Sequence, residues 1–306
     1  MNTRRKSTGQ KEVLALHFGA LGDFVLSWPA LGLLAAGPPP VRLSMVCRGS
    51  FGQLILPPGR VYDREGLRLT HLFTEHPDPA LDAWLAGFDL AAVFAQRPDP
   101  ALMKRLGSAG IAEIWTIPTR PPAGRLVHVG DLQVEALRQK GLQGPAAPLK
   151  VSLEDLPPHG QPVVAPGSGG KAKRLPPALA GRVLQRLAEN FDEPVLLTGP
   201  AEEQAYQEEI LRDCPGQGVR PVSFPSLPDL ARLLAGACLY VGPDSGVTHL
   251  AAALGAPTLA AFGPTDPREW GPRGPKVRVT SMDDLEKYLR RALSRGPSFF
   301  RGQALS

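Results

Sequence analysis

The sequence has few cysteines and no long apolar run. Its three cysteines, Cys47, Cys214 and Cys238, are irregularly spaced, which argues against a disulfide framework or a zinc site and indicates reduced thiols. No apolar stretch reaches the roughly 18 residues of a membrane-spanning helix. The stretch behind the basic N-terminus is short and interrupted by Gly and Asp, unlike a signal peptide. We therefore expect a cytoplasmic protein without a disulfide framework or a zinc site.

The charge balance is basic, and two common nucleotide signatures are missing. The net charge of +5 and the pI of about 9.3 favour anionic partners such as nucleotides, phosphorylated lipids or a membrane surface. Lys and Arg are scattered rather than clustered, which argues against nucleic acid as a partner. The chain has neither a Walker A motif nor G-x-G-x-x-G, so phosphate-loop hydrolases and dinucleotide oxidoreductases lack their signatures.

Short apolar runs alternate with helical stretches along the chain, which predicts doubly wound parallel sheets. In the first half we expect strands at residues 13–18, 41–47, 90–94 and 111–115. A helix over residues 24–34 should kink or restart at Pro29. In the second half we expect strands at residues 162–165, 195–198, 239–241 and 258–262.

A Pro/Gly-rich stretch over residues 144–160 is the predicted domain boundary. It separates an N-terminal domain, residues 1–157, from a C-terminal domain, residues 158–306. At 306 residues the chain is long enough for two domains of roughly 150 residues. For the last helix, over about residues 283–293, packing back on the N-terminal domain is an open alternative.

Three loops of the second half follow strands and lead into helices, at residues 167–170, 198–202 and 241–246. Ligands of open α/β sheets bind at such carboxyl ends, and helix N-termini suit phosphates. In the third loop, Ser245 and Thr248 add hydroxyl donors, and His249 lies one helical turn beyond Ser245. The same residues also suit a plain helix N-cap and a structural histidine, so the pattern alone leaves both interpretations open.

The segment over residues 241–257, VGPDSGVTHLAAALGAP, continues to FGPTDP at residues 262–267. Together they resemble the signature of glycosyltransferase family 9, the ADP-heptose:lipopolysaccharide heptosyltransferases. FGALGD at residues 18–23 and PAL at residues 29–31 extend the resemblance to the first half. Weaker similarities lie in PGS at residues 166–168 with KRLP at 173–176, and in HVGDL at 128–132.

The resemblance implies an α/β fold of the GT-B type, in which two Rossmann-like domains face each other across a cleft. It implies a metal-independent, inverting transferase without a cofactor. The donor, an ADP-linked sugar, would bind mainly to the C-terminal domain. The acceptor, a phosphorylated lipid-linked glycan such as lipopolysaccharide core, would bind mainly to the N-terminal domain. Peripheral contact with the inner face of the cytoplasmic membrane would follow.

Two catalytic roles follow from the resemblance. Asp23 is similar to the family's general base, which takes the proton of the attacking acceptor hydroxyl. The alternative for Asp23 is a helix cap after a glycine turn. Lys173 resembles the cation that pairs with the diphosphate or the sugar. Lys171 and Arg174 are its close competitors, and the alternative is a solvated lysine.

The resemblance also implies donor-binding roles for a set of residues in the second half: Ser168, Glu202, Asp244, Ser245, Gly246 and His249. Glu203 competes with Glu202 for the ribose hydroxyls. The chain departs from the family at His17, where Arg or Lys is usual, and at Leu175, where Trp is usual. These departures leave the sugar and the acceptor open. Two other functions compete with the transferase: a noncatalytic nucleotide-sugar-binding homologue, and another GT-B enzyme such as a nucleotide-sugar epimerase.

Overall fold

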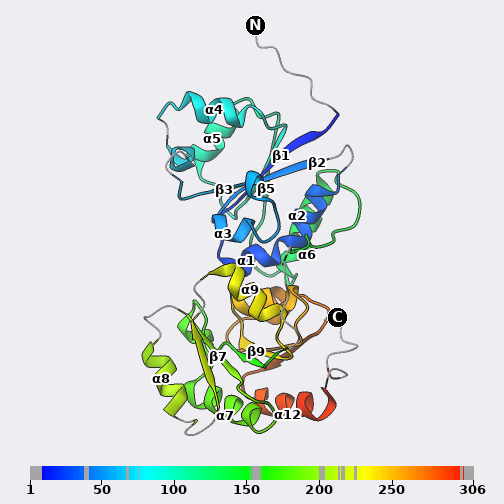
Figure 1. Cartoon of the computed structure of the whole chain (residues 1–306). Coiled ribbons are helices and arrows are strands. Elements are labelled where there is room, and N and C mark those ends of the chain that lie inside the picture. Colours follow the sequence, from blue (N-terminus) through cyan, green and yellow to red (C-terminus); the bar gives the residue numbers. More distant parts are fainter. Residues whose placement is uncertain are drawn as a thin grey trace. The chain divides into compact units, whose positions relative to one another are not determined.

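The chain divides into two compact units, Met1–Ser152 and Leu153–Ser306. The computed structural model (Figure 1) describes these residues: 9–37, 41–66, 69–74, 76–151, 153, 160–199, 204–212, 214, 218–223, 226–296 and 299. The predicted boundary after residue 157 lies outside the described residues. Each unit is an α/β layer structure with its own parallel sheet.

The first unit is built on a five-stranded sheet of order β3-β2-β1-β4-β5. Its strands are β1 (Lys11–His17), β2 (Val41–Cys47), β3 (Val61–Asp63), β4 (Leu90–Phe94) and β5 (Glu113–Ile117). All pairings are parallel, so the five carboxyl ends share one edge. The apolar run of β1 is continuous because helices cover both faces of such a sheet.

Helices connect these strands. They are α1 (Leu21–Leu26), α2 (Trp28–Ala35), α3 (Gly49–Gly52), α4 (Pro79–Leu85), α5 (Pro100–Ser108) and α6 (Val129–Gln139), with short 3₁₀ turns η1 (Pro58–Arg60) and η2 (Leu69–Phe73). Helices α2 and α6 pack side by side (Figure 1). A core of leucine, valine and alanine side chains lies between β1, β2 and β4 and the helices α4 and α5.

The predicted restart near Pro29 is confirmed. Helix α1 ends at Leu26 and α2 begins at Trp28, with Ser27 at the junction. Pro29 falls in the first turn of α2, where a missing N–H needs no intrahelical partner. The junction places the polar residue Ser27 in a fully buried position.

The second unit has a six-stranded sheet of order β11-β10-β9-β6-β7-β8. Its strands are β6 (Val163–Val164), β7 (Val195–Thr198), β8 (Arg220–Ser223), β9 (Tyr240–Pro243), β10 (Thr258–Phe262) and β11 (Val277–Ser281). All of them pair in parallel. The chain winds outwards from β6 in one direction and from β9 in the other, which is the order of a doubly wound nucleotide-binding sheet. The predicted fold class, with two Rossmann-like units, is confirmed.

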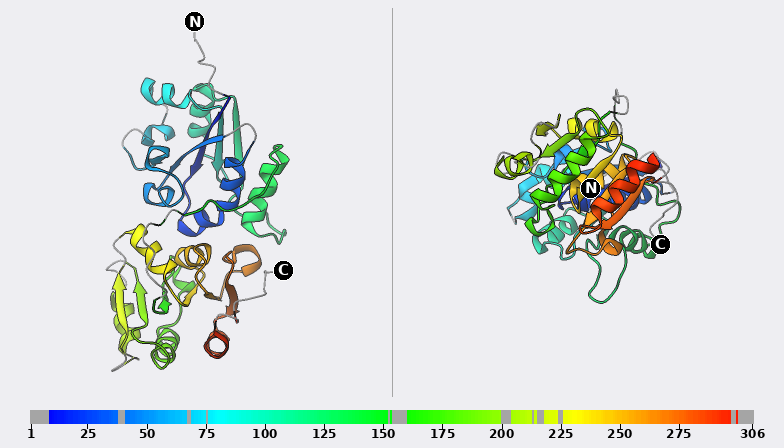
Figure 2. Two further views of the ribbon diagram at one scale, coloured as in Figure 1. Left: turned by 45° about the vertical axis from the view of Figure 1, so that its right-hand side comes forward. Right: turned by 90° about the horizontal axis from the view of Figure 1, so that it is seen from below.

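The helices of this unit are α7 (Pro177–Ala188), α8 (Gln204–Arg212), α9 (Leu227–Ala235), α10 (Gly246–Ala253), α11 (Pro267–Trp270) and α12 (Leu285–Arg295), with the turn η3 (Lys171–Lys173). Helix α12 lies beside α7 (Figure 2). Its apolar face, Leu285, Leu289 and Ala292, belongs to the core of the second unit. The apolar face of this last helix therefore packs in its own unit. Within the described residues, no helix is long and apolar enough to cross a membrane.

Candidate functional site

The loop after β9 joins the carboxyl end of a central strand to the N-terminus of α10. Ser245 is the N-cap of this helix, and its Oγ accepts a hydrogen bond from the Thr248 backbone N–H at 3.3 Å. Gly246 is the first helical residue. The free N–H groups at this end suit an anionic group, and the helix dipole adds to the attraction.

Asp244 is the electrostatic centre of this loop. Its side chain is only 6% exposed. Its Oδ2 accepts hydrogen bonds from Lys173 Nζ at 2.9 Å and Thr265 Oγ1 at 2.7 Å, and its Oδ1 lies 3.3 Å from His249 Nε2. Burial alone would raise the pKa of this carboxyl, but the hydrogen bonds from His249, Thr265 and Lys173 outweigh it and lower the pKa to about 2. Asp244 is therefore an anion that gathers three donors from three segments.

Lys173 is the cation that the structure brings to Asp244. Its side chain is 32% exposed, so the ammonium group is open to solvent on one side. Arg174 binds its own loop. Its Nε donates to the Ser168 carbonyl at 3.0 Å, and its guanidinium lies over the Tyr206 ring. Of the two competitors, Arg174 thus shapes the loop, and Lys171 makes no side-chain contact with Asp244.

Ser168 joins two of the predicted loops. Its Oγ donates to the Asp244 carbonyl at 2.9 Å, so the loop after β6 is tied to the loop after β9. Gly242 keeps the same strands close, because a Cβ there would lie 2.8 Å from the Ala165 carbonyl oxygen. Four predicted residues, Ser168, Lys173, Asp244 and His249, therefore form one connected cluster.

The hydroxyls predicted as donors have other partners. Ser245 Oγ lies 3.0 Å from Thr248 Oγ1, which also contacts Tyr240 and donates to the Pro243 carbonyl. Thr248 is buried. The expectation that Thr248 presents its hydroxyl to a ligand is corrected: this group holds the strand end to the helix. Ser245 acts as the cap, and its donor-binding role stays a prediction.

Sequence reasoning missed Thr265, whose hydroxyl is a donor to Asp244. Its position within the segment at residues 262–267, just after β10, was the available signal. Glu202 and Glu203 lie outside the described residues, so their role at the ribose stays a prediction. Leu175, the departure from the expected Trp, is fully buried in the core of the second unit.

Asp23 lies in the first turn of α1, at the carboxyl end of β1. It does not cap the helix, because the N-cap position is Ala20. Its carboxylate makes no hydrogen bond or ion pair to any described residue, although the side chain is half-buried. An unpaired carboxylate at this edge keeps its lone pairs for a proton that arrives with a substrate.

His17, the other departure from the expected pattern, is the last residue of β1 and is 1% exposed. Burial lowers the pKa of this imidazole to about 4, although the backbone carbonyl of Asp23 opposes the shift. The ring packs against Phe24 and Phe94. His17 is therefore a neutral group in the core and supplies no charge to the site.

This burial predicts an acid weakness in the first unit. Between pH 7 and pH 4 the unfolded chain binds a proton at His17 and the folded chain largely does not, so the free energy of unfolding falls with falling pH. From a pKa of 6.5 in the unfolded chain and about 4 in the folded one, the loss is about 3 kcal/mol at pH 4. Denaturant unfolding of the wild type and of His17→Phe at both pH values measures it. Equal pH dependence in the two proteins would contradict the assignment.

Arginines follow four of the five strands of the first sheet at their carboxyl ends. They are Arg48 after β2, Arg64 after β3, Arg97 after β4 and Arg120 after β5. Arg64 donates to the Phe18 carbonyl at 2.9 Å and so braces the turn before Asp23. The side chains of Arg97 and Arg120 are exposed and have no partner among the described residues. Several guanidinium groups therefore lie along the edge of the sheet that carries Asp23.

The comparisons with known proteins decide the family. The profile of glycosyltransferase family 9 (heptosyltransferase) matches residues 142–294, which is half of the chain. The chain belongs to glycosyltransferase family 9. The matched region holds the whole Lys173–Asp244–His249 cluster, while Asp23 lies before it.

Curated and solved relatives add detail. Lipopolysaccharide heptosyltransferase 3 of Escherichia coli K12 is 33% identical over 93 residues, which cover 30% of this chain. The match spans only about a quarter of that relative's length, 27%. E. coli ADP-heptose lps heptosyltransferase II has a TM-score of 0.73 at 20% identity, covering 94% of this chain and 98% of its own. An E. coli heptosyltransferase solved with ADP has a TM-score of 0.66 at 20% identity, covering 92% and 99%. These two structures show a shared fold.

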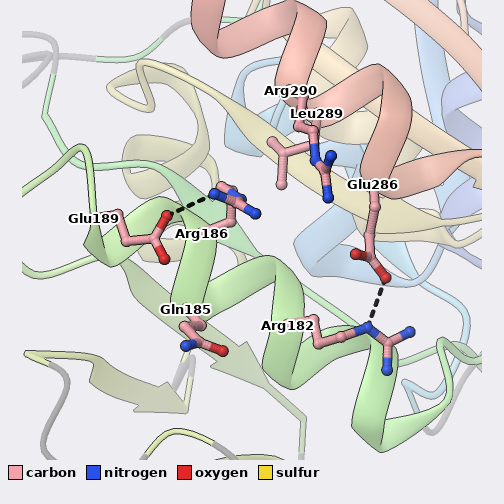
Figure 3. Close-up of a pocket in the computed structure, with 7 residues that line it drawn as sticks. All are labelled: Arg182, Gln185, Arg186, Glu189, Glu286, Leu289 and Arg290. Atoms are coloured by element: carbon pink, nitrogen blue, oxygen red, sulfur yellow. Dashed lines mark hydrogen bonds and ion pairs between the residues drawn. The ribbon is translucent and has the colours of Figure 1, made fainter.

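Two further features lie outside the cluster. A surface pocket of about 120 Å³ lies between α7 and α12, where the ion pairs Arg182–Glu286 and Arg186–Glu189 line it (Figure 3). The exposed pair Arg182–Glu286 joins α7 to α12 weakly, as surface ion pairs do, whereas Arg186–Glu189 lies within the end of α7. Within the described part of the chain, no three His, Cys, Asp or Glu side chains gather in a way that would hold a metal ion.

Proposed function

We propose that the chain is an inverting glycosyltransferase that moves a sugar, heptose from ADP-heptose, onto a hydroxyl of an anionic glycan acceptor. The observation that carries this proposal is the buried Asp244 cluster at the N-terminus of α10, inside the region that matches the family. A partly exposed lysine, free helix amides and a buried anion at one strand end suit a sugar diphosphate.

The donor would place its diphosphate at the N-terminus of α10. Lys173 has three N–H donors and gives one of them to Asp244, so the others are available to a phosphate oxygen. Negative charge builds on the diphosphate as its bond to the anomeric carbon breaks, and a fixed cation stabilises that charge without a metal. The E. coli heptosyltransferase solved with ADP supports ADP as the nucleotide of the donor.

The acceptor hydroxyl would attack the anomeric carbon from the face opposite the diphosphate, which inverts the configuration. Its proton passes to the Asp23 carboxylate as the new carbon–oxygen bond forms, and nucleoside diphosphate leaves. Asp23 suits this role because its carboxylate has no partner among the described residues. The base thus belongs to the first unit, and the residues that would bind the donor belong to the second.

The arginines at the carboxyl edge of the first sheet support an acceptor with several negative charges. Guanidinium groups bind phosphate and carboxylate in a two-pronged geometry. Arg97 and Arg120 are the exposed members of this set. A phosphorylated, lipid-linked lipopolysaccharide core fits this chemistry, and it would bring the chain to the inner face of the cytoplasmic membrane.

The reaction products test the proposal. Incubation with ADP-heptose and lipopolysaccharide core lacking heptose should yield ADP and an extended core with inverted anomeric configuration, read by mass spectrometry and NMR. The rate should be unchanged by a chelator. Donor isomerised without acceptor would show an epimerase instead, and ADP-heptose bound without turnover on any acceptor would show a noncatalytic homologue.

A further inference from the structure

A buried hydrogen-bond chain runs beneath the candidate base. His17 Nε2 lies 3.1 Å from Ser27 Oγ, and Ser27 Oγ donates to the Asp23 backbone carbonyl at 2.8 Å. The Ser27 backbone N–H also points to this carbonyl, at 3.2 Å. Both side chains, at positions 17 and 27, are fully buried. Hydrogen bonds among His17, Asp23 and Ser27 thus connect the end of β1 to the α1–α2 junction.

The direction of each hydrogen bond follows from the donors available. A carbonyl oxygen can only accept, so the single hydroxyl proton of Ser27 goes to Asp23. Ser27 Oγ must then accept from His17, which requires a proton on Nε2. In a neutral imidazole the other nitrogen, Nδ1, then carries a lone pair, and it has no partner among the described residues. A buried nitrogen lone pair without a hydrogen bond costs less folding free energy than a buried N–H without an acceptor would.

His17 and Asp23 also meet at Gly19. A Cβ on Gly19 would lie 2.9 Å from His17 Cε1, 2.9 Å from Asp23 Cβ and 3.2 Å from Asp23 Oδ2. The imidazole ring and the carboxylate side chain are therefore both packed against the backbone of this one glycine. The ring and the carboxylate therefore share one contact surface at the turn between β1 and α1.

We propose that His17 is a positioning residue for Asp23, acting through the Ser27 hydroxyl and through the packing at Gly19. The hydrogen bonds from His17 through Ser27 fix the carbonyl of Asp23 and the first turn of α1. The carboxylate is thereby held in one place without a hydrogen bond of its own. This inference rests on the proposed function of Asp23 as the base. His17 itself touches no reacting atom, because it is buried.

Kinetics separate positioning from a merely structural role. His17→Phe keeps an aromatic ring against Phe24 and Phe94 but removes the Nε2 donor, and Ser27→Ala removes the next link. Each should lower kcat about tenfold with the KM values for donor and acceptor within about twofold, because a small misplacement of a catalytic group slows chemistry more than binding. The double variant should also lose about tenfold, because both changes break one chain.

Two controls complete the kinetic test. His17→Gln keeps an N–H at the position of Nε2 and should recover most of kcat. Ser44→Ala removes another buried hydroxyl of the same unit, which contacts Arg60 and not the Asp23 turn, and should leave kcat unchanged. Multiplied losses of about a hundredfold in the double variant, unchanged kcat in both single variants, or losses confined to KM would overturn the proposal.

A spectroscopic readout keeps this inference apart from the proposed function. ¹⁵N NMR of the full chain at pH 7 should show His17 as the neutral Nε2–H tautomer. An Nδ1–H tautomer or a protonated ring would overturn the inference whatever the enzyme does. If the tautomer is as expected and Asp23→Asn has no effect on turnover, it is the proposed base that fails.

Discussion

Replacing Asp23 by asparagine is expected to lower kcat by about 10²- to 10⁴-fold, the usual cost of losing a general base. Asparagine has the same size, so the packing against Gly19 is retained. The amide cannot accept the acceptor's proton, and the step that forms the new glycosidic bond loses its base. Steady-state assays of ADP release measure kcat. Donor affinity, measured by calorimetry, should stay within about twofold of wild type, because the donor residues lie in the second unit.

Asp131→Asn is the matched control for this result. Asp131 is also an aspartate in the first turn of a helix of the first unit, α6, and it is exposed. Its replacement should leave kcat within about twofold. A loss of less than about tenfold in Asp23→Asn, or equal losses in the two variants, would remove Asp23 from the role of base.

Replacing Lys173 by alanine is expected to lower kcat/KM for the donor by about 10²- to 10³-fold, the cost of removing one group aimed at developing negative charge. The loss should appear in kcat as well as in donor KM, because the charge on the diphosphate grows as it leaves. Asp244 would keep Thr265 and His249 as partners, so the second unit should still fold. Circular dichroism and thermal unfolding check this.

Lys171→Ala is the control for Lys173→Ala. Both lysines lie in the turn η3, but only Lys173 bonds to Asp244. The Lys171 variant should keep kcat/KM within about threefold of wild type. If instead the two variants lose activity equally, a general positive charge on this loop matters, and the specific pairing of Lys173 with the diphosphate is wrong.

The buried strands were predictable from sequence, because their apolar runs are continuous. Strands β2, β4, β7 and β10 have the predicted bounds. The edge strands β3, β8 and β11 were missed for a physical reason: they are short or carry polar residues, such as the Arg-Pro-Val-Ser of β8, since one side of an edge strand faces solvent. Their places in the sheet depend on pairing with β2, β7 and β10.

The sequence predicts four residues that the structure brings into one cluster, but it does not predict their contacts. Asp244, Lys173 and His249 come from segments that only the fold brings together, so their mutual hydrogen bonds could not be derived from spacing. The predicted helix cap at Ser245 is confirmed. The role of His17 was hidden, because its burial and its link to Ser27 depend on the break between α1 and α2.

In the proposed mechanism the Asp244 cluster binds the diphosphate of a nucleotide-sugar donor. Thermal unfolding with ADP, UDP and GDP, each alone and as a sugar conjugate, tests it most directly. A nucleotide at a hundred times its Kd stabilises the folded chain by about 2.7 kcal/mol. We expect ADP and ADP-heptose to raise the unfolding midpoint, UDP and GDP to leave it unchanged, and Lys173→Ala to abolish the shift. A shift with UDP compounds alone, or an ADP shift that Lys173→Ala leaves unchanged, would contradict it.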